Sequence, residues 1–410
     1  MIVVSIIMII GLTLGALAAQ LKSYRLGGVM VLPILAIYTL REFFTPVIFI
    51  IGTVAAWISL WVLQEYTLNY GRRLFLSAVS TGVIATILTG FVLSQVFPNQ
   101  LSFETAEAIT SIFPGITAFN LMRVSPGNRR AELLIIGCGY LALIAVGVLL
   151  LWLFPTFVTQ TPPFLTLQIS DITAWIELRP QGSPHSRVIP GWIVLIILPI
   201  SIFIYEGFRQ RYDHRLVGIV IIPTLGLFTV QSSSVVIFYT LGATIIYYFI
   251  TYIQYMTLFY GRVLLTVSIL LGTIYSLIFG VFFSQLVLIP GVSLFFTGIF
   301  VGIGAYNLNR VSRKTRLAHI RIDAGLFVIS YTLLFFLIDI PVTGLLHDNL
   351  VFYIFVGIMI VALAVIEMYR LEQSIPDATA FASESAFARS SVDGIGSYES
   401  SLTADNQEDK

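Results

Sequence analysis

The fold of this chain is decided by a short stretch, NYGRRLF at residues 69–75, which partly returns as FYGRVLL at residues 259–265. The core of the stretch, Tyr-Gly-Arg at residues 70–72, recurs 190 residues later at residues 260–262. The glycine permits a tight turn between two helices. A turn that returns with its flanking segments predicts an internally duplicated chain.

The sequence around these turns recurs in the same order. At the same offset of 190, a first set of residues returns: Arg25, Leu26, Gly28 and Pro33 as Arg215, Leu216, Gly218 and Pro223. At an offset of 187, a second set returns: Gly115, Asn120, Arg123, Val124 and Ser125 as Gly302, Asn307, Arg310, Val311 and Ser312. A gap of three residues in one loop accounts for the change of offset.

Composition places the chain in a bilayer. Of its 410 residues, 57% are hydrophobic and only 10% are charged, whereas soluble domains carry about 25% charged residues. Apolar runs of membrane length predict thirteen helices. The runs lie near 2–21, 26–40, 43–64, 74–97, 106–122, 131–154, 191–207, 216–230, 234–258, 263–289, 291–308, 323–343 and 349–369.

The predicted fold is therefore an all-α polytopic membrane protein, with about 13 transmembrane helices. Six crossings per unit, an even number, make the two repeats parallel, and one extra helix follows them. The expected divisions are 1–155 for repeat 1, 156–190 for an extracytoplasmic linker, 191–343 for repeat 2, 344–370 for the additional helix and 371–410 for a disordered acidic cytoplasmic tail.

The positive-inside rule sets the expected orientation. With the N-terminus outside, 17 of the 20 basic residues before the tail fall on the cytoplasmic face. The outer face then carries only Arg41, Arg179 and Arg187. We expect a multi-pass protein of the cell membrane whose acidic tail lies in the cytoplasm.

Two segments of each unit are short or interrupted, which is the usual pointer to a pathway in duplicated transporters. The candidates for such kinks and for a pathway are Pro33, Pro114, Gly115, Asn120, Pro223, Gly302 and Asn307. Pro33 and Pro223 remove a backbone donor near the middle of their runs. The alternative is that these residues serve ordinary kinks and close helix packing.

The repeated cytoplasmic arginines are the candidates for binding a polyanion, because guanidinium groups hold carboxylates and phosphates bidentately. They are Arg72, Arg73, Arg123, Arg262 and Arg310. The alternative is that they follow positive-inside topology and meet anionic lipid headgroups.

No catalytic motif accompanies this framework. The sequence has no phosphate-binding loop, no His-Glu-x-x-His motif and no serine-nucleophile elbow. Its one cysteine, Cys138, sits in an apolar run, and we expect a buried thiol. We therefore expect no catalytic residue, no metal, no cofactor and no nucleic-acid partner, and a chain that is not catalytic on its own.

The same motifs resemble the poly-γ-glutamate capsule biosynthesis proteins of the PgsC/CapC family. The stretch from Arg25 to Ala36 resembles that family's second segment, residues 69–75 its Tyr-Gly-Arg-Arg turn, and residues 113–120 its Pro-Gly element. The second copy departs from the pattern at Val263 and Val301. Family members usually have one unit of about half this length, so this chain resembles a tandem duplicated form.

The resemblance implies a non-catalytic membrane subunit of a poly-γ-glutamate synthase complex. Its partners would be a cytoplasmic ATP-dependent ligase, other capsule-synthesis membrane subunits, the poly-γ-glutamate chain and the lipid bilayer. Two other functions stay open on the sequence alone. One is a secondary transporter or channel for a small anion, and the other is a scaffold that anchors a cytoplasmic enzyme.

Overall fold

The computed structural model describes a helical protein. The residues it describes are 1–22, 24–67, 71–97, 111–153, 161–177, 191–212, 218, 221–283, 289–337 and 350–373. Strands are absent from these ranges. Most of the predicted acidic tail, from 374 onward, and both ends of the predicted linker lie outside the described residues.

The helices follow the order of the repeat. Those of the first unit are α1 (Ile2–Lys22), α2 (Val31–Arg41), α3 (Thr45–Tyr66), α4 (Arg72–Val96), α6 (Ile112–Met122) and α7 (Pro126–Leu153). The short helix α8 (Asp171–Ile176) lies between the units. Those of the second unit are α9 (Gly191–Tyr212), α10 (Ile221–Gln231), α11 (Ser234–Thr257), α12 (Gly261–Phe282), α13 (Gly291–Arg310) and α14 (Arg316–Leu337), and α15 (Leu350–Gln373) follows them.

Each of the thirteen predicted runs contains a helix, and the multi-pass membrane class is confirmed. Among the described residues, nine helices are long and apolar enough to cross a membrane. Three others, α2, α6 and α10, have 11 residues each. At 1.5 Å per residue such a helix is about 16 Å long, roughly half of a hydrocarbon core.

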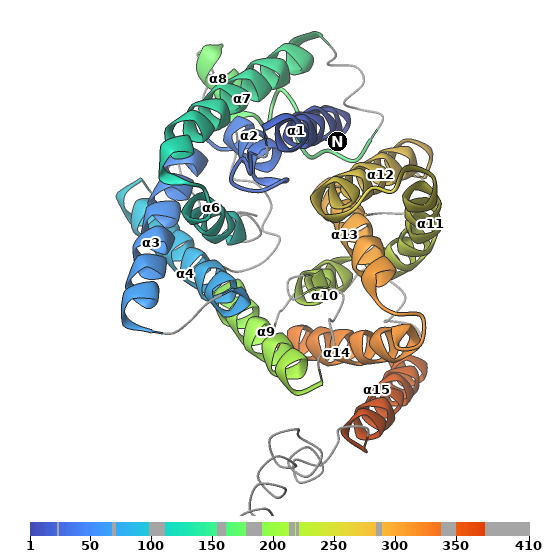
Figure 1. Ribbon diagram of the computed structural model, residues 1–410. Coiled ribbons are helices and arrows are strands. Elements are labelled where there is room, and N and C mark those ends of the chain that lie inside the picture. The colour runs from blue at the N-terminus through green and yellow to red at the C-terminus, as the bar shows by residue number, and fades with distance from the viewer. Residues whose placement is uncertain are drawn as a thin grey trace, which may run out of the picture.

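Figure 1 shows the helices arranged as a ring of four groups. In chain order, the groups are α1 with α2 and α7, α3 with α4 and α6, α9 with α10 and α14, and α11 with α12 and α13. Contacts between the units are reciprocal: α1 packs on α12, and α9, at the position of α1 in the second unit, packs on α4. Helix α15 packs on α14, outside the ring.

The three short helices begin in the same way. Each carries proline as its third residue: Pro33 in α2, Pro114 in α6 and Pro223 in α10. Proline is tolerated in the first turn, where its missing N–H has no partner to lose. Pro33 therefore stands at a helix start, not near the middle of a longer helix as the sequence predicted, because residues 26–30 form turns before α2. The residues directly before α10, 219–220, lie outside the described residues, so the prediction for Pro223 stays a prediction.

The glycines of the repeated turns behave as predicted. Gly71 has φ +65° and Gly261 has φ +63°, the left-handed conformation that favours glycine. Each lies directly at the start of its helix, α4 or α12. These turns set the entry of the fourth helix in both units.

Two further repeated glycines allow close helix crossings. A Cβ atom built on Gly115 of α6 would lie 2.2 Å from the carbonyl oxygen of Ala78 in α4. A Cβ atom built on Gly302 of α13 would lie 2.5 Å from the carbonyl oxygen of Ser268 in α12. Small residues let membrane helices approach in this way.

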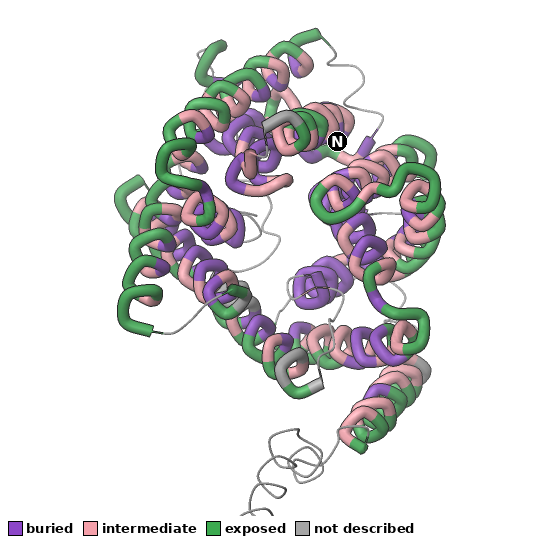
Figure 2. The backbone as a smooth tube through the Cα atoms, in the orientation of Figure 1, coloured by how far each residue is buried: buried purple, intermediate pink, exposed green. Residues whose placement is uncertain are grey.

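Burial is concentrated on the inner helices, as Figure 2 shows. Fifteen of the 20 residues of α13 are buried, whereas α3 and α11 present apolar side chains outward. Cys138 of α7 is exposed, so the prediction of a buried thiol is wrong. In a membrane protein an apolar run does not indicate burial in protein, because lipid solvates the outward side chains.

Candidate anion-binding site

A strained turn lies between α1 and α2. Leu26, Gly27 and Gly28 all have positive φ values, of 47°, 67° and 136°. Leu26 adopts this conformation at a cost of roughly 1–2 kcal/mol, since its Cβ crowds the backbone. The side chain of Asn120 in α6 holds the turn, because its Nδ2 donates to Gly27 O at 3.0 Å and to Ile116 O at 3.0 Å.

Arg25 precedes this turn and is fixed by a buried carboxylate. Its backbone N–H donates to Glu132 Oε1 of α7 at 2.9 Å. Glu132 is only 1% exposed. One guanidinium nitrogen of Arg25, Nη1, is buried without a hydrogen-bond partner among the described residues. A guanidinium has five donors, so Arg25 keeps capacity for an anion.

The second unit brings another arginine to this place. Arg262, at the start of α12, interacts electrostatically with Arg25, Arg123 and Glu132 of the first unit. The charges of Arg25, Arg123 and Glu132 in the first unit thus act on Arg262 of the second unit. We call Arg25, Arg123, Arg262 and Glu132 the Arg25 cluster. Its excess of positive charge fits an anion of more than one charge.

Arg123 and Arg310 have the same local geometry. The guanidinium carbon of Arg123 lies 4.9 Å from the ring centroid of Phe119, four residues earlier in the chain. That of Arg310 lies 5.6 Å from the ring centroid of Tyr306, and its Nη1 also donates to the Tyr306 hydroxyl at 3.3 Å. The aromatic ring orients each guanidinium, and Arg123 keeps more free donors than Arg310.

A second repeated pair of arginines caps the fifth helix of each unit. Arg129 Nε donates to Val124 O at 3.1 Å, and Arg316 Nη2 donates to Val311 O at 3.1 Å. The sequence places both residues on the predicted cytoplasmic face, with Arg129 close behind Arg123. Arg129 follows Arg123 by six residues, and Arg316 follows Arg310 by six residues. This equal spacing marks them as a repeated pair. They satisfy carbonyls left free at a helix end.

The predicted polyanion residues are therefore only partly brought together. Arg123 and Arg262 join the Arg25 cluster. Arg73 is exposed on α4, and within the described residues it has no ion pair with the cluster. Arg310 lies with Tyr306 at the end of α13. Arg72 is the first residue of α4, and its side chain is not among those that the structure describes.

The predicted pathway residues lie at contacts between helices. A Cβ atom on Gly11 of α1 would lie 2.5 Å from Pro33 Cβ, and one on Gly52 of α3 would lie 3.2 Å from Pro114 Cβ. Pro223 is buried in α10, and Asn307 is partly buried in α13. Close packing against Gly11 and Gly52 accounts for the contacts of Pro33 and Pro114.

The units also meet through aromatic rings. Tyr38 of α2 and Phe228 of α10, at equivalent positions, both lie beside Phe296 of α13, with centroid distances of 6.1 and 6.4 Å. Phe300 lies 6.3 Å from Phe296. These rings fill the space where α2, α10 and α13 approach one another.

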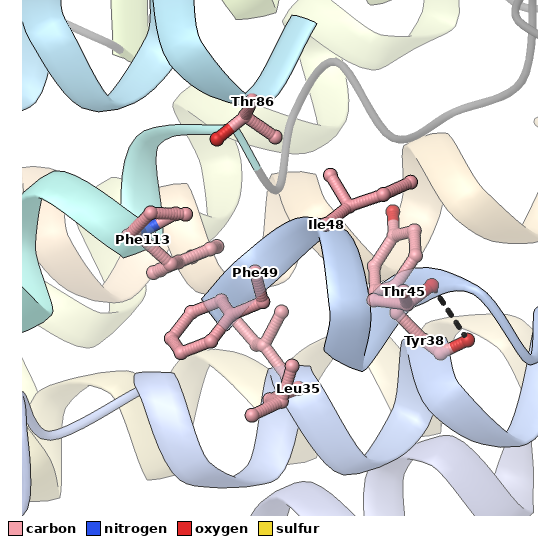
Figure 3. A pocket seen from close by; sticks show the side chains of 9 residues that line it. Leu35, Tyr38, Thr45, Ile48, Phe49, Thr86 and Phe113 are labelled. Atoms are coloured by element: carbon pink, nitrogen blue, oxygen red, sulfur yellow. Dashed lines mark hydrogen bonds between the residues drawn. The ribbon is translucent and has the colours of Figure 1, made fainter. Parts of the chain in front are cut away.

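A pocket lies beside these rings, between α2, α3, α4 and α6 (Figure 3). Its empty volume is about 350 Å³. Nine residues line it: Ile34, Leu35, Tyr38, Thr45, Ile48, Phe49, Thr86, Phe113 and Pro114. None carries a charge, and both threonine hydroxyls donate to backbone carbonyls, Thr45 to Tyr38 and Thr86 to Gly82. The pocket is therefore unsuited to an anion.

Comparison with known proteins supports the duplication seen in the sequence. Residues 10–130 and 200–317 each match the same family model, described as capsule biosynthesis CapC. The two matches together cover more than half of the 410 residues. Searches of curated proteins and of solved structures gave no match.

Proposed function

The chain belongs to the capsule biosynthesis CapC family, and we propose that it is the integral membrane subunit that receives and exports poly-γ-glutamate. It is a multi-pass membrane protein of capsule biosynthesis. The polymer carries one carboxylate per residue, so its recognition calls for a cluster of cations. The Arg25 cluster is the observation that carries the proposal.

The proposed topology is two parallel six-helix repeats, at 1–155 and 191–343, with thirteen crossings in all. The reciprocal contacts of α1 with α12 and of α9 with α4 support an axis along the membrane normal. In this topology the N-terminus lies outside, and the end of the molecule that carries the Arg25 cluster faces the cytoplasm. The acidic tail after α15 then also lies in the cytoplasm.

The proposed division of labour follows from the family resemblance. It assigns ATP-dependent amide ligation to a separate cytoplasmic ligase, which agrees with the lack of a phosphate-binding loop in this sequence. The growing chain passes its carboxylates to Arg25, Arg123 and Arg262. Because Arg25 and Arg123 come from the first unit and Arg262 from the second, both units contribute to one entry site.

The proposed route runs outward between the short helices α2, α6 and α10 and the long helix α13. On this proposed route Tyr38 and Phe228 each lie beside Phe296, and Phe300 lies beside Phe228. Moving a hydrated polyanion against these apolar rings carries a large desolvation cost. In this proposal export requires these helices to separate.

The first experiment is a deletion of the gene. Glutamate released by acid hydrolysis from the anionic polymer at the cell surface is measured in the parent, the deletion strain and complemented strains. We expect loss of the polymer in the deletion strain and recovery with the intact chain. An unchanged polymer level would overturn the proposal and favour a transporter for a small anion.

The second experiment tests the Arg25 cluster. We expect the double variant Arg123→Gln/Arg262→Gln to lower surface polymer by at least about tenfold, since each lost charge-assisted contact is worth roughly 1.5–3 kcal/mol. The matched control is Arg313→Gln, which removes an exposed arginine at the end of the molecule where α13 ends. Membrane levels of all variants are compared by immunoblot. Equal polymer from the double variant and the control would sink the role of the cluster.

A further inference from the structure

A second arginine stands at the opposite end of α2 from the Arg25 cluster. Arg41 is the last residue of α2 and is only 7% exposed. Its Nη1 is buried without a hydrogen-bond partner among the described residues. A buried guanidinium with an unused donor is costly unless it serves a ligand.

An aromatic ring covers Arg41. The guanidinium carbon lies 5.5 Å from the ring centroid of Phe164, which belongs to the segment between the two units. Phe164 is only 2% exposed. Its ring stacks on Phe295 of α13 at 5.6 Å and meets Tyr38 of α2 edge-on at 6.2 Å. Phe164 thus lies where the first unit meets the second.

The covering segment, residues 161–177, is held by buried side chains and by contacts to backbone atoms. Phe164 and Leu165 are buried in the hydrophobic core. Ser170 Oγ donates to Leu40 O at 2.6 Å, and the amino group of Met1 donates to Pro162 O at 3.4 Å. The carbonyls of Pro162 and Pro163 approach Gly291, where a Cβ atom would lie 2.7 Å from each oxygen. Lifting the segment would therefore expose Phe164, while the transmembrane helices could stay folded.

The segment also carries a carboxylate on which the charge of Arg41 acts. The Phe43 N–H donates to Asp171 Oδ2 at 3.4 Å, and Asp171 interacts electrostatically with Glu42 and, more weakly, with Arg41. Glu42 itself is buried. An arriving carboxylate therefore meets a site in which Asp171 already balances part of the charge of Arg41. Exchange of one carboxylate for another would release the segment.

The second unit lacks this charge. The residue equivalent to Arg41, 190 positions later, is Gln231, whose Oε1 accepts from Ser293 Oγ at 3.1 Å. The same place in the repeat is thus compatible with an uncharged amide. This makes Arg41→Gln a substitution that the fold already contains.

We propose that Arg41 is a second anion-binding site, for carboxylates of the polymer at the far end of α2, and that residues 161–177 form a lid over it. The inference rests on the proposed function, because that function supplies the polymer. The lid covers Arg41 with Phe164 and Asp171 when the site is empty. It lifts when polymer carboxylates take the place of Asp171.

The test follows the exposure of position 164. Cys138 is first replaced by serine, and Phe164→Cys is introduced into the full chain, purified in detergent. Labelling by a polar maleimide is timed alone, with a γ-linked glutamate decamer, and with free glutamate at equal carboxylate concentration. Trp175→Cys is the matched control, because Trp175 is 69% exposed in the same segment and its labelling should not change.

We expect the decamer to speed labelling of Phe164→Cys by roughly fivefold, an effect of about 1 kcal/mol. Adding Arg41→Gln should abolish the acceleration. Adding Asp171→Asn instead should keep the acceleration, since Arg41 is still present to bind the carboxylates. Acceleration that persists in Arg41→Gln, or no acceleration in any chain that elutes as a single species, would overturn the inference.

The outcomes separate the two proposals. A decamer response lost with Arg41→Gln supports the site whether or not cells need the chain for capsule. An equal response to free glutamate keeps the anion site and overturns the polymer as its ligand. If deletion of the gene removes the surface polymer but the decamer does not change the labelling rate, the proposed function stands and the lid is overturned.

Discussion

The two units of this protein share a frame and differ in their charges. In both, a left-handed glycine starts the fourth helix, and a glycine in the fifth helix lets two helices cross at backbone contact. In both, an arginine lies on the aromatic ring four residues before it. These shared features determine where helices begin and end and how closely they pack. They therefore maintain the fold that both units share and do not distinguish the function of one unit from that of the other.

The differences fall at buried or charged positions. Arg41 corresponds to Gln231, Glu132 to His319, and Pro114 to Val301. The first unit therefore supplies the arginine beneath the lid and the carboxylate of the Arg25 cluster. The second unit supplies α13, a long helix with 15 of its 20 residues buried. The comparison teaches that the two copies keep one frame while most of the proposed anion-binding residues come from the first.

The largest expected effect tests the shared frame. Gly115→Ala and Gly302→Ala should each cost about 4 kcal/mol or more, because the new Cβ meets backbone atoms that cannot rotate away. The measurement is the yield of monodisperse protein after detergent extraction. Gly137→Ala in α7 is the control, since a Cβ there has nothing within 4 Å and alanine favours the helix. Similar yields of all three would break the idea of a shared crossing.

The next prediction concerns a position of the fifth helix at which the two units differ, Pro114 in the first and Val301 in the second. Helix α13 continues through Val301, whereas α6 has Pro114 in its first turn. Val301→Pro should cost about 3 kcal/mol, because it removes an internal N–H donor and clashes with the preceding turn. Pro114→Val should change stability by less than about 1 kcal/mol. Thermal unfolding in detergent gives both values, and equal losses would contradict this account of the short helix.

A third prediction compares the two stacked arginines. Arg123→Gln should lower surface polymer about tenfold, whereas Arg310→Gln should lower it about twofold. The reason is that Arg123 belongs to the Arg25 cluster, while Arg310 already donates to Tyr306. Phe119→Tyr sharpens the comparison, since a new hydroxyl beside Arg123 should compete for its donors. A larger loss from Arg310→Gln than from Arg123→Gln would reverse the assignment of the units.

The smallest effect concerns the lid, which covers Arg41 but not its counterpart. Burial raises the pKa of Asp171 from 3.8 to about 6, and nearby Glu42 adds to the rise while the Phe43 N–H and Arg41 oppose it. Folding thus favours the protonated carboxyl. Its contribution to stability is fully present below pH 3.8 and is lost as the pH rises through about 6.

We expect this contribution to be about 1 kcal/mol, because partial exposure weakens the full linkage effect. The measurement is the unfolding temperature in detergent between pH 4 and pH 7, compared between the natural chain and Asp171→Asn. The natural chain should lose stability over this range more than the variant does. Parallel curves would show that Asp171 is not desolvated by the lid.

Much of the frame was predictable because it is local. The turn at Gly71 and its copy at Gly261 followed from the residue type alone, since only glycine takes that conformation without strain. The start of α2 was misplaced, because hydrophobic runs do not separate a helix from the apolar turn before it. The exposure of Cys138 was misjudged for a related reason: apolar segments can face lipid or protein equally.

The candidate site was only half predictable. Arg123 and Arg262 were predicted as polyanion-binding candidates from their repeated motifs. Arg25 was recognised only as a repeated residue, and nothing in the local sequence pairs it with an arginine 237 positions away. The backbone bond from Arg25 to Glu132 and the ring of Phe164 over Arg41 were equally hidden. Such contacts depend on which helices become neighbours.

The sequence by itself determined the membrane class, the duplication and the residues at each turn, because bilayer length, hydropathy and glycine conformation act over a few residues. The tertiary structure alone decided which charges meet. Arg262 interacts with Arg25 because α12 packs on α1, and Arg41 is covered because Phe164 packs between α2 and α13. Charges interact through space over distances that the order of the chain does not set.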